Sequence, residues 1–534
     1  MKKKFYVTTT IPYANAAPHI GFALEVIQAD VLARWNKQKG KDVFFLTGTD
    51  EHGTKNYQTA KNQGFGAQKF VDKNSAFFKK LTKVLNISND YFIKTTDKKV
   101  HWPGVVKMWK LLEKKGDIYK KSYTGNYCSG CERFVTDKDL VEGKCPNHPT
   151  KEIENISEEN YFFRLSKYSD KIEKLIESDK LKISPKKWKN NFLGLVREGL
   201  QDVSFSRSKE HLPWGIPVPG DDGQVMYVWC DALTNYLTGI GYPNKKFEKF
   251  WPADVHVVGK DMLRFHTGIW PGMLLSAGLS LPKEVIVHGF LTVAGRKMSK
   301  SVGNVVSPLE LSKKYSADSI RYVLLRATPF GDDGDFSEKA LIDRHNNELA
   351  NKLGNLVSRV SGLIEKFGVE EFENKIPLPP EWEKLIKEGK AEIEVSEDPE
   401  VKDKSIHILK IKGQRDIKRG EPFPLIVSEH LGLFYKATKL LVEKHLDNYE
   451  FDKALNEIFK FIDHCNWYIQ IRKLWETKNK KNLFELKESI LKIAELLWPF
   501  IPESSEKIKK QFSAKKIKKN QILFKKINVE NLVH

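Results

Sequence analysis

The sequence of 534 residues contains only five cysteines, and it has no apolar run of the roughly 20 residues that a membrane-spanning helix requires. Residues 1–4 are basic, as at the start of a signal peptide, but Asn15, Pro18 and His19 interrupt the place where its apolar segment would lie. Three of the cysteines stand within eighteen residues of one another, which is typical of a metal site and not of a disulfide framework. The sequence therefore predicts a protein of the reducing cytoplasm.

Low-complexity composition is also missing. Hydrophobic residues make up 40% of the chain and aromatic residues 11%, which excludes a disordered chain, and the 34 glycines and 23 prolines follow no collagen-like repeat. The length suggests three or four domains. Acidic residues are too few to balance the basic ones, since 89 Lys and Arg against 69 Asp and Glu leave a net charge of +20. This excess suggests a polyanionic partner such as nucleic acid, or simply a lysine-rich composition, and composition does not separate the two.

A strand–loop–helix order marks the beginning of the chain. Residues 5–10 have the composition of a strand, residues 20–40 carry apolar side chains on one helical face, and residues 42–47 form a second apolar run. The strand pattern returns at residues 255–259 and 285–289. This alternation predicts an α/β fold with a parallel sheet, whose ligands gather at the carboxyl ends of the strands.

Two other parts of the chain depart from this pattern. Residues 115–215 are rich in Lys, Glu, Asn and turn residues, which predicts an insertion into the nucleotide-binding fold. In the last third of the chain, amphipathic patterns such as residues 349–367 and 433–445 predict an all-helical domain. Residues 390–430 do not fit that domain, because residues 405–411 have the pattern of a strand, and both a β-hairpin excursion and a mobile loop are compatible with them.

The first candidate for chemistry is His19-Ile20-Gly21, where the loop after the first strand enters a helix. A helix N-terminus offers unpaired N–H groups and a positive potential to a phosphate. The imidazole of His19 can donate a hydrogen bond to that phosphate, and Gly21 lets the backbone approach a nucleotide closely. Alone, however, such a histidine is more often an ordinary loop residue.

The second candidate is Lys297-Met298-Ser299-Lys300-Ser301, in a glycine-flanked loop after the strand at residues 285–289. Two lysines on a mobile loop can clamp a triphosphate and neutralise the charge that develops during its reaction. Alone, such a loop is usually a solvated surface turn. Together with His19-Ile20-Gly21, about 280 residues earlier, it resembles the signature pair of class I aminoacyl-tRNA synthetases.

Within that class, the chain resembles the methionyl-tRNA synthetases along nearly its whole length. The segments that carry this resemblance are Ile11-Pro12-Tyr13-Ala14-Asn15, Leu46-Thr47-Gly48-Thr49-Asp50-Glu51-His52-Gly53, Tyr227-Val228-Trp229-Cys230-Asp231-Ala232-Leu233, Val258-Gly259-Lys260-Asp261, Phe265-His266 and Pro329-Phe330-Gly331-Asp332-Asp333-Gly334-Asp335-Phe336-Ser337. The resemblance implies a Rossmann-like parallel-sheet catalytic domain that is split by a zinc-binding connective peptide and followed by an all-α anticodon-binding domain. The expected boundaries are 1–114 and 216–310 for the two catalytic halves, 115–215 for the connective peptide, 311–340 for a stem-contact linker and 341–534 for the helical domain, with its irregular insertion at about 390–430.

The resemblance also assigns residues to binding sites. The ammonium group of methionine would meet Asp50, and its thioether would lie among Ile11, Tyr13, Trp229, Ala232, Leu233, Tyr236, Met262 and His266. The ATP-binding residues would be His19, Gly21, Gly259, Asp261, Lys297 and Lys300, of which His19, Lys297 and Lys300 would be catalytic. A thioether packs well against aromatic rings and a carboxylate suits an ammonium group. Spacing alone leaves open that Trp229 and Tyr236 are ordinary core aromatics.

One position departs from the family signature. The signature ends in a second histidine, which normally contacts the ATP phosphates in the transition state, and here that position is Phe22. His19, the helix N-terminus and the two lysines would then carry this stabilisation. We still expect activity.

The cysteine cluster reads Cys128-x2-Cys131, thirteen residues, then Cys145-x2-His148. Two short ligand pairs on separate turns give the tetrahedral Cys3His coordination of a structural zinc site. It also resembles the zinc knuckle in the connective peptide of methionyl-tRNA synthetases. With no open ligand position, one Zn2+ per chain would fold the insertion and would not take part in chemistry.

For RNA, the resemblance places Asn355, Arg359 and Trp475 at anticodon-reading positions, with Trp467 as a second aromatic candidate. Amide and guanidinium groups can read splayed-out bases, and an indole can stack on one, although a polar surface face with a half-buried tryptophan would give the same pattern. The family usually has proline before the tryptophan, where this chain has Leu474. No oligonucleotide-binding barrel follows the helical domain, so we expect a monomer.

The resemblance implies a methionine–tRNA ligase, which activates L-methionine with ATP and Mg2+ to methionyl-adenylate and transfers it to the 3′ end of tRNA(Met). Two alternatives remain open. One is a class I synthetase for another small amino acid. The other is a non-enzymatic tRNA-binding paralogue, which Phe22 favours and the intact Asp50, Lys297 and Lys300 oppose.

Overall fold

A computed structural model describes residues 3–128, 133–135, 137–146, 149, 151–298, 303–372, 377–397, 405–412, 425–426 and 430–528. It divides into two compact units. Met1–Phe290 and Ser299–Glu310 form the first unit, and Leu291–Met298 and Leu311–His534 form the second.

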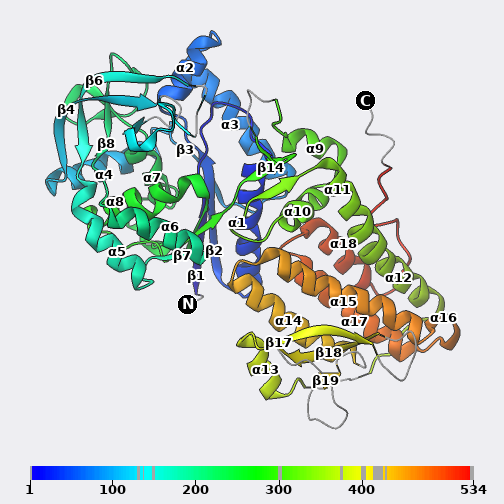
Figure 1. The fold of residues 1–534 in the computed structure, drawn as a ribbon. Coiled ribbons are helices and arrows are strands. Elements are labelled where there is room, and N and C mark those ends of the chain that lie inside the picture. The colour runs from blue at the N-terminus through cyan, green and yellow to red at the C-terminus, as the bar shows by residue number, and fades with distance from the viewer. Residues whose placement is uncertain are drawn as a thin grey trace. The chain divides into compact units, whose positions relative to one another are not determined.

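The first unit is built on a six-stranded sheet in the order β3-β2-β1-β12-β13-β7 (Figure 1). All neighbouring strands in it run parallel. Their bounds are Lys4–Thr9 for β1, Asp42–Thr49 for β2, Tyr91–Lys94 for β3, Lys182–Ser184 for β7, Val255–Gly259 for β12 and Glu284–His288 for β13. The inner strands are almost continuously apolar and buried, because helices cover both faces of the sheet. The expected parallel α/β sheet is therefore confirmed.

Helices pack on both faces of this sheet. On one face lie α1 (Ile20–Gln38) and α3 (Ala67–Val84), where the rings of Phe22 and Phe78 meet edge to face at 5.2 Å. Gly40, at φ +76°, ends the turn after α1 in a conformation that favours glycine. On the other side of the sheet, Figure 1 shows α4 (Trp102–Lys114), α7 (Trp229–Thr238) and α8 (Trp270–Ala277). Their buried side chains form the largest core of this unit.

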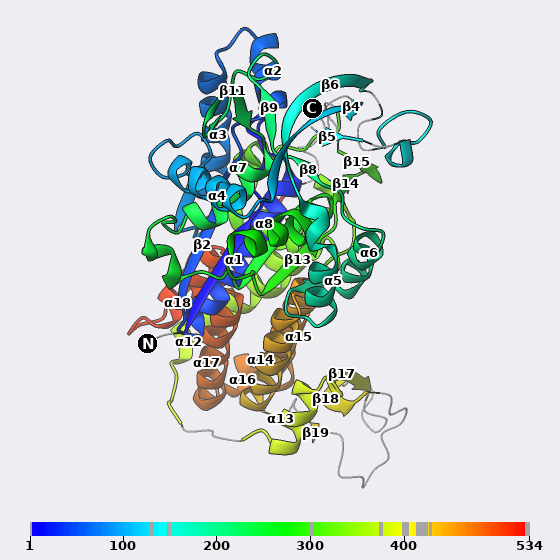
Figure 2. The same cartoon turned by 90° about the vertical axis from the view of Figure 1, so that its left-hand side faces the viewer.

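Antiparallel sheets and short helices complete the first unit. A four-stranded sheet has the order β5-β4-β6-β8, and Figure 2 shows its long strands β4 and β6 side by side. A three-stranded sheet has the order β10-β11-β9. The bounds of these elements and of the nearby helices are Ile118–Cys128 (β4), Arg133–Phe134 (β5), Ile153–Phe163 (β6), Val203–Ser204 (β8), Ser206–Ser208 (β9), Pro217–Val218 (β10), Asp221–Met226 (β11), Thr54–Asn62 (α2), Ser169–Glu177 (α5) and Lys186–Arg197 (α6).

The second unit is mainly helical. Its helices are α10 (Ala317–Arg326), α11 (Glu338–Arg344), a π-helical segment (His345–Gly354) that continues into α12 (Asn355–Phe367), α13 (Pro380–Lys387), α14 (Leu431–Asp447), α15 (Phe451–Ile471), α16 (Leu474–Thr477), α17 (Lys480–Leu497) and α18 (Pro502–Phe512); α9 (Pro308–Lys314) begins in the first unit. Arg321 of α10 is fully buried, and its guanidinium donates to the carbonyls of Pro499 and Phe500 at 2.8 and 2.7 Å. These bonds fasten α10 to the junction of α17 and α18. The expected helical C-terminal domain is confirmed.

The segment that did not fit a helical bundle contains a small sheet. The antiparallel order is β17-β18-β19, with bounds Ala391–Glu397, Ser405–Ile411 and Leu425–Ile426. The β-like pattern at residues 405–411 is thus confirmed as β18. Ahead of this sheet, α13 buries Trp382 and Ile386 and packs on α14.

Among the residues described, no helix combines the length and the apolar character that a membrane crossing would require.

Candidate active site and RNA-binding groove

The candidate active site lies where the order of the central sheet reverses. From β1 the chain proceeds to β2 and β3 on one side, whereas β12 and β13 add on the other side. Residues 10–14 follow β1, Asp50 follows β2, and Gly259 and His288 end β12 and β13. Because these strands are parallel, all four positions meet at one edge of the sheet. Such a switch point is where open α/β sheets bind ligands.

At this edge, His19 caps the N-terminus of α1. Its Nδ1 accepts a hydrogen bond from the backbone N–H of Gly21 at 3.0 Å, so the neutral ring carries its proton on Nε2. The side chain of His19 is exposed. In this tautomer Nε2 is a hydrogen-bond donor and not an acceptor.

The expectation of unpaired N–H groups at this helix end is wrong. The N–H of Ile20 donates to the carbonyl of Val306 at 3.1 Å, and those of Phe22 and Ala23 donate to the carbonyl of His19. Together with the bond from Gly21 to His19 Nδ1, these bonds give each N–H group of the first turn of α1 an acceptor. A sequence pattern locates the end of a helix, but it does not show which acceptors bind the N–H groups of its first turn.

The loop with the two lysines follows a hairpin in the second unit. Strands β14 (Leu291–Val293) and β15 (Arg296–Lys297) are joined by Ala294 and Gly295, which both have positive φ, as a two-residue hairpin turn requires. The Asp335 carboxylate accepts from the Gly295 N–H at 2.9 Å and from the Thr292 hydroxyl at 2.7 Å. These bonds lower the pKa of Asp335. Asp335 thus holds the hairpin that presents exposed Lys297, whereas Lys300 lies outside the described residues.

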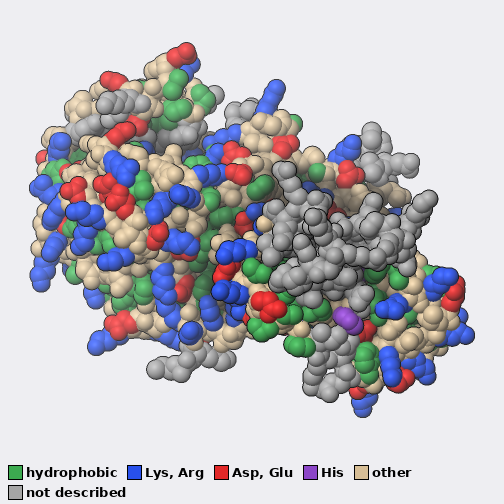
Figure 3. Space-filling model, turned by 60° about the horizontal axis from the view of Figure 1, so that its bottom comes forward, with side chains coloured by type: hydrophobic (Ala, Val, Ile, Leu, Met, Phe, Trp, Pro, Cys, Tyr) green, Lys and Arg blue, Asp and Glu red, His purple; other side chains and the backbone are tan. Residues whose placement is uncertain are grey.

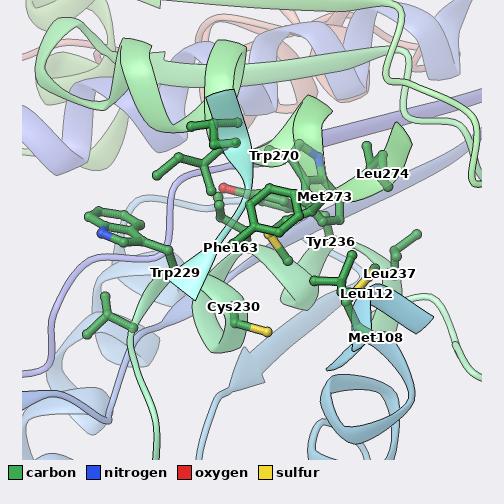
Figure 4. Close-up of a cluster of buried hydrophobic side chains, with 14 of the residues drawn as sticks. Met108, Leu112, Phe163, Trp229, Cys230, Tyr236, Leu237, Trp270, Met273 and Leu274 are labelled. Carbon is green, nitrogen blue, oxygen red and sulfur yellow. The ribbon is translucent and has the colours of Figure 1, made fainter. Parts of the chain in front are cut away.

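Most residues assigned to the methionine side chain lie in one apolar cluster. Trp229, Leu233 and Tyr236 belong to its buried core, and Ile11, Tyr13 and Met262 pack against it partly buried. Trp229 and Cys230 leave α7 in different directions (Figure 4). The Trp229 indole stacks on Phe265, with ring centroids 3.6 Å apart. Ala232 and His266 are buried as well.

Backbone hydrogen bonds connect Asp50 to the loop at residues 10–14, which carries two members of this cluster. The backbone N–H of Asp50 donates to the carbonyl of Pro12 at 2.9 Å, and the N–H of Ala14 donates to the carbonyl of Asp50 at 2.9 Å. Asp50 is 4% exposed. The carboxylate expected to meet an ammonium group is therefore held beside the loop that carries Ile11 and Tyr13.

A neutral polar pair, Tyr236 and His266, is buried within the cluster. The Tyr236 hydroxyl lies 2.6 Å from His266 Nε2, and His266 Nδ1 lies 3.0 Å from the carbonyl of Met262. Nδ1 donates to that carbonyl, so Nε2 accepts from Tyr236. Burial lowers the pKa of His266 to about 4 and raises that of Tyr236. Both groups are therefore uncharged near neutral pH, which suits an uncharged side chain such as a thioether better than a charged one.

Sequence reasoning missed an ion pair at the same edge of the sheet. Glu25 of α1 accepts from the N–H of Thr10 at 2.7 Å and pairs with His288 Nε2 at 3.0 Å, while His288 Nδ1 lies 2.8 Å from the carbonyl of Gly289. Burial alone lowers the pKa of His288, but Glu25 and this carbonyl raise it above its usual value. A carboxylate and a carbonyl thus face the two ring nitrogens, and both favour the protonated form of His288. The sequence places His288 in the predicted strand at residues 285–289 and assigns it no role.

Gly259 and Asp261, both assigned to ATP binding, lie close together in space. A Cβ atom on Gly259 would lie 2.8 Å from Asp261 Oδ1 and 3.6 Å from the ring of His288. A side chain at this position would displace the Asp261 carboxylate, whereas 3.6 Å to the His288 ring is an ordinary contact. The absence of a side chain at residue 259 leaves the backbone open to a ligand.

Half of the expected zinc ligands can be placed. Cys128 and Cys145 are both buried in a small cluster with Val135, whereas Cys131 and His148 lie outside the described residues. Within the described ranges, no group of three His, Cys, Asp or Glu side chains is arranged to hold a metal ion.

In the second unit, a polar groove of about 350 Å³ lies between α15 and the helix formed by the end of the π-helical segment and the start of α12. Its lining residues are Asn351, Lys352, Asn355, Arg359, Asp463, Asn466, Trp467 and Gln470. Lys352 pairs with Asp463 at 2.7 Å, and the Asn466 amide donates to the carbonyls of Lys352 and Ile462. These bonds connect the two sides of the groove. The side-chain amides, the guanidinium of Arg359 and the indole of Trp467 line the same space.

Of the two candidate tryptophans, Trp467 lines this groove. Trp475, in α16, is 42% exposed, and its Nε1 donates to Glu476 at 3.2 Å. On the face drawn in Figure 3, Lys and Arg side chains are interleaved with Asp and Glu and do not gather in one patch. The candidate RNA contact is therefore identified by the residues that line the groove and not by an excess of basic side chains on that face.

Known families match this chain over both units. A family model for tRNA synthetases class I (M) matches residues 5–156 and 148–361, and one for the anticodon-binding domain of tRNA ligase matches residues 434–530. The methionine–tRNA ligase of Caldanaerobacter subterraneus subsp. tengcongensis is 40% identical over 99% of this chain and 80% of its own length. The chain belongs to the methionyl-tRNA synthetases of class I. The methionine–tRNA ligase of Thermotoga maritima is likewise 39% identical over 96% of this chain and 75% of its own length.

Solved structures extend the match to the fold. A methionyl-tRNA synthetase of Mycobacterium tuberculosis in complex with methionyl-adenylate has a TM-score of 0.80 at 35% identity, covering 95% of this chain and 93% of that one. Its apo form has a TM-score of 0.76 at 30% identity, covering 99% of each chain. Within this family of methionyl-tRNA synthetases, Phe22 is a local difference from the signature, and its ring is buried against α3.

Proposed function

We propose that the chain is a methionine–tRNA ligase, which forms methionyl-adenylate from L-methionine and ATP and transfers the methionyl group to the 3′ end of tRNA(Met). The observation that carries this proposal is identity of about 40% over the full chain to ligases of this name, together with an apolar cluster that meets a buried carboxylate at the switch point. Asp50 offers a charge partner to the ammonium group, and the neutral Tyr236–His266 pair offers a wall to the thioether.

The first step needs no protein nucleophile. The methionine carboxylate attacks the α-phosphate of ATP in line, and pyrophosphate leaves, so positioning and electrostatic stabilisation supply the catalysis. His19 donates from Nε2 towards phosphate oxygens, and Lys297 and Lys300 neutralise charge on the leaving group. Gly259 and Asp261 hold the ribose. Magnesium accompanies ATP and balances its phosphate charge.

We expect His19→Ala and Lys300→Ala each to slow methionyl-adenylate formation by roughly 10-fold or more, because each removes a contact to charge that develops in the transition state, and each decade corresponds to about 1.4 kcal/mol. Methionine-dependent exchange of pyrophosphate into ATP measures this step. Exchange at the wild-type rate in both variants would contradict the assignment of the site.

A structural zinc ion is proposed for the insertion. Cys128 and Cys145 already share one buried cluster, and with Cys131 and His148 they would form a closed Cys3His set. When bound, zinc supplies folding free energy to this segment.

Metal analysis of protein purified without chelator should find about one zinc per chain. Cys128→Ser should lose it, because one of four ligands is removed. Cys465→Ser is the matched control, since Cys465 is buried in α15 away from the cluster, and it should retain zinc. Metal-free wild-type protein would refute the site.

For tRNA, we propose that Asn355, Arg359 and Trp475 read the anticodon, with Trp467 as a further stacking residue in the groove. Lysines and helix surfaces would add salt-dependent attraction to phosphates. From the resemblance to the family we also propose the division of the chain into five segments, with 115–215 as connective peptide and 311–340 as stem-contact linker. A cytoplasmic location and a monomeric state are proposed as well.

Pyrophosphate exchange with each of the twenty amino acids tests the activity. Exchange should be strongest with methionine. Exchange with another small amino acid instead would favour a different class I specificity. Absent exchange with retained tRNA binding would favour the non-enzymatic alternative.

A further inference from the structure

A buried histidine–carboxylate–histidine cluster links the loop that carries Asp50 to the helix that carries Trp229. Asp231 of α7 has no exposed surface, and its two carboxylate oxygens accept from different histidines. His52 Nδ1 lies 2.6 Å from Oδ2, and His101 Nε2 lies 2.7 Å from Oδ1. Burial raises the pKa of Asp231, but the two histidines outweigh it and lower the pKa below its usual value. Asp231 is therefore a carboxylate with both oxygens occupied.

Each histidine is fixed on its other side by a separate element. His52 stands two residues after Asp50, its ring lies edge to face with Trp214 at 5.3 Å, and the Asn56 amide donates to its carbonyl at 3.1 Å. Asn56 also donates to the carbonyl of Asp50 at 3.2 Å. The loop that carries Asp50 is thus coupled through His52 to α7.

The second histidine fastens the far end of the same helix. His101 Nδ1 lies 2.8 Å from the hydroxyl of Thr238, the last residue of α7, and His101 itself precedes α4. A Cβ atom on Gly104 would lie 2.3 Å from Thr238 Cγ2, so α4 and α7 are in contact without space for a side chain. Helix α7 is therefore held at its first and last turns.

This cluster and the expected methionine pocket share helix α7. Along α7, Trp229, Ala232, Leu233 and Tyr236 are assigned to the pocket, and Asp231 points from the same helix to the cluster. Rotation of α7 or movement of the Asp50 loop would change the distance between the apolar wall and the carboxylate. No residue of the cluster is needed to touch methionine.

We propose that Asp231 is a positioning residue that, by holding His52 and His101, sets the spacing between the Asp50 carboxylate and the aromatic wall of the methionine pocket. The proposal rests on the proposed function, since it takes methionine as the ligand. It makes the recognition of the ammonium group depend on a residue that does not contact it. A cluster that served only stability would leave that recognition unchanged.

The test compares two ligands in two variants. L-Methionine and 4-(methylsulfanyl)butanoate differ only in the ammonium group. The dissociation constant of the butanoate divided by that of methionine, both from competition binding, therefore reports the contact with Asp50. In Asp231→Asn this ratio should fall at least 10-fold, and the KM for methionine should rise far more than the KM for ATP. The control is Asp117→Asn, a buried carboxylate bound to Tyr168, Ser276 and Lys167. It should leave the ratio within 2-fold of wild type.

A second variant covers the case in which Asp231→Asn does not fold. Thr238→Val keeps the shape of the side chain but removes the hydroxyl partner of His101, and it should lower the ratio in the same direction by a smaller factor. A lowered melting temperature with an unchanged ratio, in whichever variant folds, would overturn the proposal. Wild-type protein that did not activate methionine would instead refute the proposed function, so the two failures are distinguishable.

Discussion

Replacement of Asp50 by asparagine should lower kcat/KM for methionine in pyrophosphate exchange by about 100-fold or more. Loss of one partner of a buried, hydrogen-bonded charge pair costs about 2–5 kcal/mol, and 2.7 kcal/mol corresponds to about 100-fold. Asparagine keeps the size of the side chain, and the backbone bonds of residue 50 to Pro12 and Ala14 do not involve it. The loss should therefore appear in methionine recognition and not in folding.

The adjacent residue provides the control for this substitution. Glu51 is fully buried, accepts from the Thr49 hydroxyl at 3.1 Å and lies 3.5 Å from Lys94. Glu51→Gln should reduce thermal stability while it leaves the KM for methionine within about 3-fold, as a change away from the ligand would. If Asp50→Asn and Glu51→Gln had equal effects on that KM, Asp50 would not be the ammonium partner.

Arg359→Ala should reduce kcat/KM for tRNA charging by about 10- to 100-fold and leave pyrophosphate exchange within 2-fold of wild type. A specific contact between a guanidinium and a base is worth about 1–3 kcal/mol. Arg359 lines the groove in the helical unit, and adenylate formation needs no tRNA. The measurement is the initial rate of methionyl-tRNA formation at several tRNA concentrations, beside exchange on the same preparation.

Arg344→Ala is the matched control for the groove. Arg344 pairs with Glu348 one turn further along, at 2.9 Å, and does not line the groove with Arg359. Its loss removes the same charge from the same unit, so a general electrostatic contribution would lower charging equally in both variants. Equal effects would show that residue 359 contributes charge and not base recognition.

The sequence predicted the elements whose side-chain pattern is repetitive. The apolar helical face at residues 20–40 and the apolar run at residues 42–47 correspond to α1 and β2, and the β-like segment at residues 405–411 is strand β18. Such patterns are local, because each follows from one face of a helix or strand being buried. The parallel sheet followed by a helical domain could therefore be derived from the sequence alone.

Contacts between distant segments could not be derived in this way. Glu25 and His288 are separated by 263 residues and meet only because β1 and β13 end at the same edge of the sheet. Asp335 was part of a recognised segment, but its bond to the hairpin turn at Gly295 depends on the parallel pairing of β14 and β16 (Gly334–Phe336). No periodicity encodes such partners, and the same holds for Asp231 between two histidines.

The site residues themselves were assigned through resemblance and not through spacing. The structure brings Trp229, Leu233 and Tyr236 into one cluster and puts Trp467, beside Asn355 and Arg359, in the groove. Their roles toward methionine, ATP and the anticodon stay predictions until variants are measured. Trp229 and Tyr236 are both buried, as core aromatics also are.

The central claim is that this chain attaches methionine to tRNA, and the most direct measurement is the formation of acid-precipitable methionyl-tRNA. Purified protein, ATP with Mg2+, radiolabelled methionine and unfractionated tRNA should give ATP-dependent incorporation. Periodate-oxidised tRNA, which lacks an intact 3′-terminal ribose, should accept none. Incorporation that is absent with intact tRNA, or that occurs with another amino acid in place of methionine, would contradict the account.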